Sequence, residues 1–155
     1  MEFSEQDRLF MRRAIVLAQQ ASKADEVPIG AVLVRDNQLI AEGYNQSIAL
    51  QDASAHAEIN CIRQAGLKEK NYRLPETTLY ATLEPCSMCA GALIHARIKR
   101  LVFAAYDEKA GAVCSVHQLL HSNPRQHRVD WRGGLFEMEC AQLLSQFFKE
   151  KRAKR

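Results

Sequence analysis

Two short segments of the chain carry residue types that bind metals and transfer protons. His56 and Glu58 are two residues apart, and Cys86 and Cys89 are three residues apart, directly after Pro85. Thiolate and imidazole are ligands that zinc prefers, and residues at i and i+3 of a helical turn lie on one side of it. The spacing therefore predicts that Cys86 and Cys89 hold one zinc ion, with His56 as the third protein ligand.

Three protein ligands leave one corner of a tetrahedral zinc site open for water, which is typical of a catalytic site. Zinc lowers the pKa of such a water from about 16 towards 7 and so provides a nucleophile at neutral pH. From mid-helix, Glu58 and His56 could not share the ion, because their side chains would point about 200° apart. At a first helical turn Glu58 can instead approach the water, and we expect it to be the general acid and base.

Each segment alone has a plainer explanation. Cys-x-x-Cys also occurs in thioredoxin-like redox pairs, and His-Ala-Glu is a common chance triplet. The two segments together, each expected at a helix start, favour the metal site. A fourth protein ligand, for which Cys114, His117 or Cys140 are candidates, would instead indicate a zinc-stabilised RNA-binding module.

The elements that must position these residues alternate between helices and strands. Apolar periodicity predicts four helices, over residues 4–24, 56–64, 86–96 and 135–151. Runs of apolar and β-branched residues predict five strands, over residues 27–34, 38–44, 77–83, 100–105 and 128–131. We expect 107–127 to be mostly loop and Gly66 to end the second helix. The alternation predicts an α/β protein with three layers, α/β/α, around one mixed five-stranded sheet.

Composition narrows the class of protein. The 155 residues fit one domain, over 1–155, and the charged fraction of 25% and net charge of +3 are ordinary for a soluble protein. No stretch approaches the roughly 20 apolar residues that span a bilayer, and the first ten residues lack the layout of a secretion signal. We therefore expect a cytoplasmic protein without a membrane partner, and its five cysteines are not expected to form disulfides.

The two metal-binding segments resemble the zinc-dependent nucleobase deaminases, whose signature is His-x-Glu followed by Pro-Cys-x-x-Cys. The likeness runs over nearly the whole chain and includes residues 26–32, 43–45, 55–58, 71–74, 82–92 and 94–98. Met-Cys-Ala-Gly-Ala and His-Ala-Arg-Ile are similar to the bacterial tRNA adenosine deaminases rather than to the cytidine deaminases of free nucleosides.

This resemblance implies a cytidine-deaminase-like fold, a homodimer, one zinc ion per subunit and no organic cofactor. It implies hydrolytic deamination of adenosine to inosine at wobble position 34 of a tRNA anticodon, typically in a tRNA for arginine. Water activated by zinc would attack C6 of an adenine flipped out of the anticodon loop, while Glu58 carries the protons. A deaminase of free bases or nucleotides, such as guanine or deoxycytidylate, is the alternative enzyme.

The resemblance also implies how the substrate is held. Asn45 would hold the target nucleotide, and four apolar residues would surround the base: Val27, Ile29, Ala57 and Leu83. From the residues alone, Val27, Ile29 and Leu83 could be ordinary strand core, and Asn45 could cap a turn.

Two further positions concern RNA. Asp107 resembles a family aspartate near the anticodon backbone, where a 2′-hydroxyl would be its partner, although it could instead cap a loop. On the last helix, Leu135, Met138, Leu143, Leu144 and Phe147 form an apolar stripe that we expect to be buried. This leaves Phe148 beside the basic tail 149–155, where an exposed ring could stack on an unpaired base; core packing and a solvated helix end are the alternatives.

Overall fold

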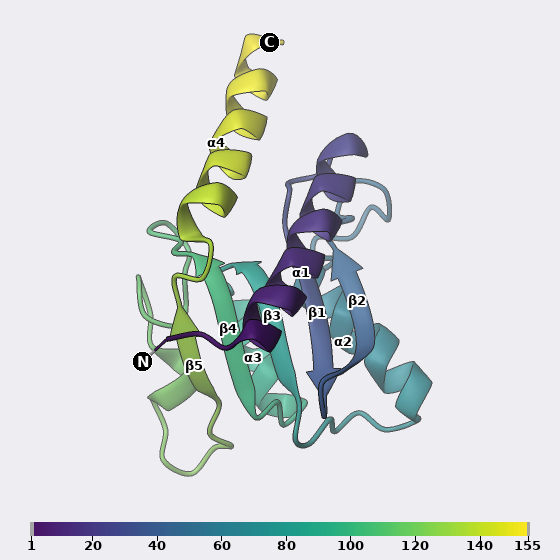
Figure 1. The fold of residues 1–155 in the computed structure, drawn as a ribbon, viewed down its shortest axis with the longest axis vertical. Helices are drawn as coiled ribbons and strands as arrows, with labels where there is room; N and C mark the ends of the chain where they lie inside the picture. The colour runs from purple at the N-terminus through teal and green to yellow at the C-terminus, as the bar shows by residue number, and fades with distance from the viewer. Residues whose placement is uncertain (1, 155) are drawn as a thin grey trace.

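The computed structural model describes residues 2–154, in which four α-helices cover the two faces of a five-stranded sheet (Figure 1). The strands are β1 (Gly30–Arg35), β2 (Gln38–Tyr44), β3 (Thr78–Leu83), β4 (Arg100–Ala105) and β5 (Asp130–Gly133). The helices are α1 (Glu5–Lys23), α2 (Ala57–Glu69), α3 (Ser87–His95) and α4 (Glu137–Ala153), with a short 3-10 turn at Leu119–His121. The predicted three-layer α/β/α fold with a mixed sheet is confirmed.

The direction of the strands brings four chain segments to one edge of the sheet. The strand order is β2-β1-β3-β4-β5, and β1 runs antiparallel to β2 and β3, whereas β3, β4 and β5 are parallel. The amino end of β1 therefore lies beside the carboxyl ends of β2, β3 and β4. That edge gathers residues 27–29, 45–56, 84–86 and 105–107, which include both predicted metal-binding segments.

The central strands are buried on both faces, which explains their continuous apolar sequence. Ala31 and Leu33 of β1 pack in the core beneath α2 and α3, whereas Val32 and Val34 pack in the core beneath α1. The same alternation holds in β4, where Phe103 faces the α2–α3 layer and Val102 the α1 layer. Two separate cores thus fix the sheet from both sides.

Two glycines allow helices to approach the sheet closely. A Cβ at Gly30 would lie 2.1 Å from the Ala14 carbonyl oxygen in α1, and one at Gly43 would lie 2.5 Å from the Ala57 carbonyl oxygen in α2. Since Ala57 is the first residue of α2, the contact at Gly43 places the start of that helix directly against the edge strand.

Two predicted boundaries are wrong. The first strand begins at Gly30 rather than at Val27, because the Ile29 N–H donates to the Val27 carbonyl at 2.8 Å and closes a tight turn around Pro28. Gly66 does not end α2, which continues to Glu69. The helix ends where Lys70 adopts a left-handed conformation (φ 54°) and its N–H donates to the Gly66 carbonyl.

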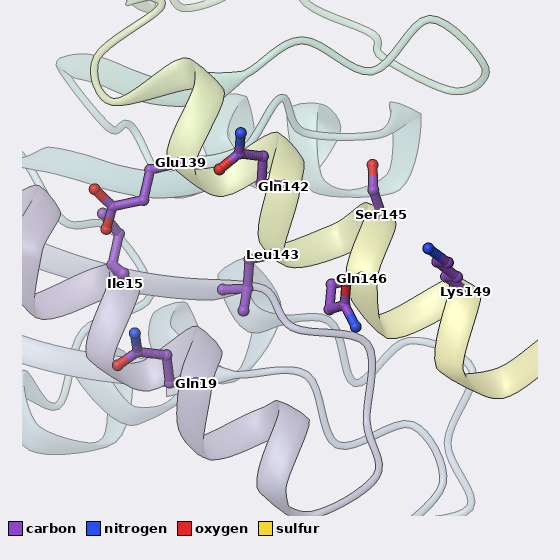
Figure 2. A pocket seen from close by; sticks show the side chains of 8 residues that line it. All are labelled: Ile15, Gln19, Glu139, Gln142, Leu143, Ser145, Gln146 and Lys149. Carbon is purple, nitrogen blue, oxygen red and sulfur yellow. The ribbon is translucent and has the colours of Figure 1, made fainter.

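Helix α4 leaves the sheet and projects beyond its edge (Figure 1). It faces α1 across an open groove of about 550 Å³, lined by Ile15 and Gln19 from α1 and by six residues of α4 (Figure 2). Met138 is 74% exposed, so its predicted burial is wrong. It lies on the opposite side of the first turn of α4 from Cys140, which is the residue buried in the core beneath α1. Leu135 and Phe147 of the same apolar stripe are buried as expected, whereas Leu143 and Leu144 are only half-buried. Within residues 2–154, no helix is long and apolar enough to cross a membrane.

Candidate active site

The predicted metal ligands come together at the starts of two helices. His56 is the residue directly before α2, and Cys86 is the residue directly before α3. His56 Nδ1 lies 3.6 Å from the sulfur of Cys86 and 3.6 Å from that of Cys89. One imidazole and two thiols that converge in this way form a donor set that suits zinc.

Charge favours metal binding at this point. Helix N-termini carry partial positive charge, which stabilises thiolates. The pKa of Cys86 is lowered to about 4, chiefly by a hydrogen bond from Cys89 and then by one from His56. A thiolate is the form in which cysteine binds a metal.

Glu58 lies beside this cluster but does not belong to it. Within residues 2–154, His56, Cys86 and Cys89 are the group whose ligand atoms all lie within 4.8 Å of one another. The Glu58 side chain is almost fully buried, and this burial raises the pKa of its carboxyl to about 7. A carboxyl that titrates near neutral pH can both accept and release a proton, which is what general acid–base catalysis requires.

The candidates for a fourth protein ligand lie outside the cluster. In the described part of the chain, neither Cys114, His117 nor Cys140 contributes an atom to it. Cys140 is buried in the core beneath α1, and Cys114 is half-buried with a thiol outside the metal-ligand group. A site with three protein ligands retains a position for water, as in catalytic zinc sites.

A pocket of about 630 Å³ opens above the cluster. Its more buried part is formed by the predicted wall residues Val27, Ile29 and Leu83, together with Asn45, His56, Glu58, Glu84 and Cys86. Its outer part is formed by residues 105–110 and by four residues of α4: Glu137, Ala141, Leu144 and Phe148. The pocket thus combines an apolar recess with a polar mouth, an arrangement that suits a flat aromatic base attached to a polar backbone.

Asn45 lines the pocket and Ala57 does not, but a hydrogen bond joins the two residues. The Asn45 Oδ1 accepts a hydrogen bond from the Ala57 N–H at 2.7 Å, which fixes the orientation of the amide because Nδ2 could not accept there. Ala57 itself is fully buried and does not line the pocket. The Nδ2 group of Asn45 forms no hydrogen bond within residues 2–154 and remains a donor for a ligand.

The residues expected to contact RNA lie at the pocket mouth. The Asp107 carboxylate caps its own turn, because Oδ1 accepts from the N–H groups of Lys109 (3.0 Å) and Ala110 (3.2 Å). Phe148 is 44% exposed and packs edge-to-face on the buried Phe147, with ring centroids 5.5 Å apart. The Phe148 ring therefore contacts the buried Phe147 ring and also lines the pocket.

The groove between α1 and α4 has different chemistry. Its one carboxylate, Glu139, is paired with Arg12 at 2.7 Å, and no metal-ligand group of the described residues lies in it.

Comparison with known proteins agrees with this site. A family model described as the cytidine and deoxycytidylate deaminase zinc-binding region matches residues 4–105. The chain belongs to this deaminase family. The match spans both helix starts, so it includes His56, Glu58, Cys86 and Cys89.

Relatives within the family are closely similar over nearly the full length. The tRNA-specific adenosine deaminase of Haemophilus influenzae is 47% identical over 150 residues, which cover 96% of this chain and 87% of the relative. That of Agrobacterium fabrum is 49% identical, covering 92% of this chain and 94% of the relative. The resemblance to the bacterial tRNA adenosine deaminases is confirmed.

Solved structures extend the comparison. A structure from biochemical and structural studies of A-to-I editing by tRNA:A34 deaminases is 48% identical, with a TM-score of 0.84, and covers 88% of this chain and 99% of that one. The guanine deaminase of Bacillus subtilis is 39% identical with a TM-score of 0.62, covering 67% and 66% of the two chains.

Several pocket residues had no signal in the sequence. Glu137, Ala141 and Leu144 approach the site only because of the direction in which α4 leaves the sheet, which no local pattern encodes. Glu84 lies between an apolar strand and the Pro-Cys turn, and burial of a carboxylate in such a place depends on partners distant in the sequence.

Proposed function

We propose that the protein hydrolyses adenosine at wobble position 34 of a tRNA anticodon, typically in a tRNA for arginine, to inosine and ammonia. The observation that carries the proposal is the His56–Cys86–Cys89 group with Glu58 buried beside it, at the base of a pocket wide enough for a purine. The close relatives named as tRNA-specific adenosine deaminases support the substrate.

The reaction forms a C–O bond at C6 of the adenine and breaks its bond to the exocyclic amine. One zinc ion per subunit, held by His56, Cys86 and Cys89, would lower the pKa of a water molecule in the pocket. Glu58 accepts a proton from that water and delivers protons to ring N1 and to the departing amine. Burial raises the pKa of this carboxyl to about 7, so that it can both accept and release a proton at neutral pH.

The rest of the pocket holds the nucleotide. Val27, Ile29 and Leu83 would enclose the adenine, and Asn45 Nδ2 would donate to an acceptor on the target nucleotide. Ala57 acts through its backbone, since its N–H orients the Asn45 amide.

Residues at the mouth would contact the anticodon loop. The second carboxylate oxygen of Asp107 would accept from a 2′-hydroxyl, which distinguishes RNA from DNA, and the Phe148 ring would stack on an unpaired base. Basic residues of 149–154 would face phosphates. Truncation after Gln146 should weaken tRNA binding and reduce its salt dependence; unchanged affinity and salt dependence would exclude this contact.

The quaternary structure and the compartment belong to the same proposal. We expect a homodimer in the cytoplasm, with a single deaminase domain and one zinc site in each subunit. Sedimentation equilibrium of the zinc-loaded protein should give twice the chain mass of 17.5 kDa, together with one zinc per chain by elemental analysis.

One assay tests the substrate class. The zinc-loaded protein is incubated with an anticodon stem-loop carrying adenosine at position 34 and, separately, with free guanine, which is the substrate named for the similar Bacillus subtilis enzyme. The proposal predicts inosine in the RNA and no ammonia from guanine. Ammonia from guanine without inosine in the RNA would assign the protein to the deaminases of free bases.

A further inference from the structure

Glu84 is a buried carboxylate that the reaction does not use. It is 1% exposed, lies at the end of β3 and stands two residues before the metal ligand Cys86. Within residues 2–154 it has no ion pair with a lysine, arginine or histidine. A charged group in such a position needs other partners, because burial without them is costly.

The partners are the N–H groups of one loop, residues 107–115. Oε1 accepts from the Asp107 N–H at 3.1 Å. Oε2 accepts from three consecutive N–H groups, those of Val113 (3.1 Å), Cys114 (2.9 Å) and Ser115 (3.0 Å), and the Ser115 hydroxyl donates to Oε1. The loop therefore wraps around a single carboxylate, and both of its ends are bound to it.

The backbone of the loop packs closely on this carboxylate. A Cβ on Gly111 would lie 2.4 Å from the Glu84 carboxyl carbon, so the backbone of the loop passes directly over the side chain. The Ala112 N–H also donates to the Pro85 carbonyl at 2.8 Å. The loop is thus attached to the turn that carries Cys86 through both the side chain of Glu84 and the backbone of Pro85.

The first part of this loop lines the mouth of the active-site pocket. Asp107, Glu108, Lys109 and Ala110 all border the pocket, and the turn they form is closed by Asp107 Oδ1. None of the groups that perform the reaction lies in the loop, since His56, Glu58 and Cys86 come from the two helix starts.

We propose that Glu84 is a positioning residue that holds loop 107–115 in the shape that receives the RNA around the target nucleotide. The inference rests on the proposed function, because it assigns the loop to substrate binding by the same site. Loss of the Glu84 carboxylate should leave the metal site and the chemical step in place and weaken the binding of RNA. In kinetic terms, KM for the RNA should rise while kcat stays nearly constant.

Glu84→Gln tests this directly. Glutamine has nearly the same shape, but it keeps only one accepting oxygen. Its NH₂ group must therefore take the place of either Oε1 at the Asp107 N–H or Oε2 at the N–H groups of residues 113–115, where it cannot accept. Glu76→Gln is the matched control, because Glu76 is exposed and pairs with Lys99 away from the pocket. For each zinc-loaded protein, zinc content, hydrogen exchange of the amides of residues 107 and 113–115, and kcat and KM on the anticodon stem-loop are measured.

The expected result for Glu84→Gln is one zinc per chain, faster exchange at residue 107 or at residues 113–115, KM raised about tenfold and kcat within about threefold of the original protein. Glu76→Gln should change none of these. An unchanged KM, or a fall in kcat alone, would overturn the inference. If Glu84→Gln does not fold, Ser115→Ala decides: it removes one donor, so KM should rise about two- to threefold, and an unchanged KM would overturn the inference.

The two proposals fail in different ways. If the unsubstituted protein does not deaminate the RNA, the proposed function is wrong, whatever the variants do. If it deaminates the RNA and Glu84→Gln does so with the same KM, the role of Glu84 is wrong and the proposed function stands.

Discussion

Asn45 performs two separable tasks, and substitutions can distinguish them. Its Oδ1 accepts from the buried N–H of Ala57 at the start of α2, and its Nδ2 is left for the substrate. Asn45→Ala removes both groups. The orphaned N–H should cost about 1–3 kcal/mol of unfolding free energy, and the lost substrate hydrogen bond should lower kcat/KM as well.

Asn45→Asp should separate the two effects. A carboxylate oxygen still accepts from Ala57, and the positive end of α2 favours its charge, so the unfolding free energy should stay within about 1 kcal/mol. The donor is lost, and the substrate acceptor then faces a carboxylate, so kcat/KM should fall at least about tenfold, equivalent to about 1.4 kcal/mol.

The assay combines urea unfolding of the zinc-loaded proteins with initial rates of inosine formation on the stem-loop. Wild-type kcat/KM in Asn45→Asp would refute the assignment of Nδ2 to the substrate. Unchanged stability of Asn45→Ala would refute the role of Oδ1 at the helix start.

The remaining predictions concern stability and the metal. Burial alone would raise the pKa of Asp7, but hydrogen bonds from Arg100, Tyr80 and Ser4 outweigh it and hold this pKa well below its usual value. Asp7→Asn should therefore lower the free energy of unfolding at pH 7, measured in urea, by about 3 kcal/mol. The difference in unfolding free energy between the two proteins should shrink as the pH falls below about 4, because protonation of Asp7 removes the same contribution from the original protein. A constant difference down to pH 2 would contradict this. Gly43→Ala should cost about 1–3 kcal/mol and lower activity, because its Cβ would meet the start of α2; full stability would show that the helix can move away freely. Chelation should lower the melting temperature and abolish inosine formation together, and added zinc should restore both; activity that persists without zinc would argue against a catalytic metal.

Local chemistry made much of the site predictable. The Cys86 and Cys89 spacing together with the His-Ala-Glu segment predicts a zinc site without any knowledge of the fold. Continuous apolar runs between helical patterns define a sheet covered on both faces. The starts of α2 and α3 could be predicted because a metal-ligand residue lies at each of them and Pro85 precedes the second.

Other features depend on contacts that no short window contains. Residues 107–115 have no periodicity, and their shape is set by Glu84, which is 23 to 31 residues away in the sequence. The burial of Met138 was wrongly expected because the core covers the opposite side of the same helical turn, where Cys140 lies, and an apolar stripe does not show which side is covered. Val27 and Ile29 lie in a turn rather than a strand, since Pro28 interrupts the pairing of β1.

The most direct test of the central claim compares the zinc-loaded protein with Glu58→Gln on one anticodon stem-loop, with inosine at position 34 detected by mass spectrometry. The original protein should convert adenosine 34 and spare other adenosines. Glu58→Gln should keep one zinc per chain and lose turnover by a factor of about 10² or more. Conversion by Glu58→Gln at the original rate would contradict the role of Glu58 in proton transfer, and no inosine from the zinc-loaded original protein would contradict the proposed reaction.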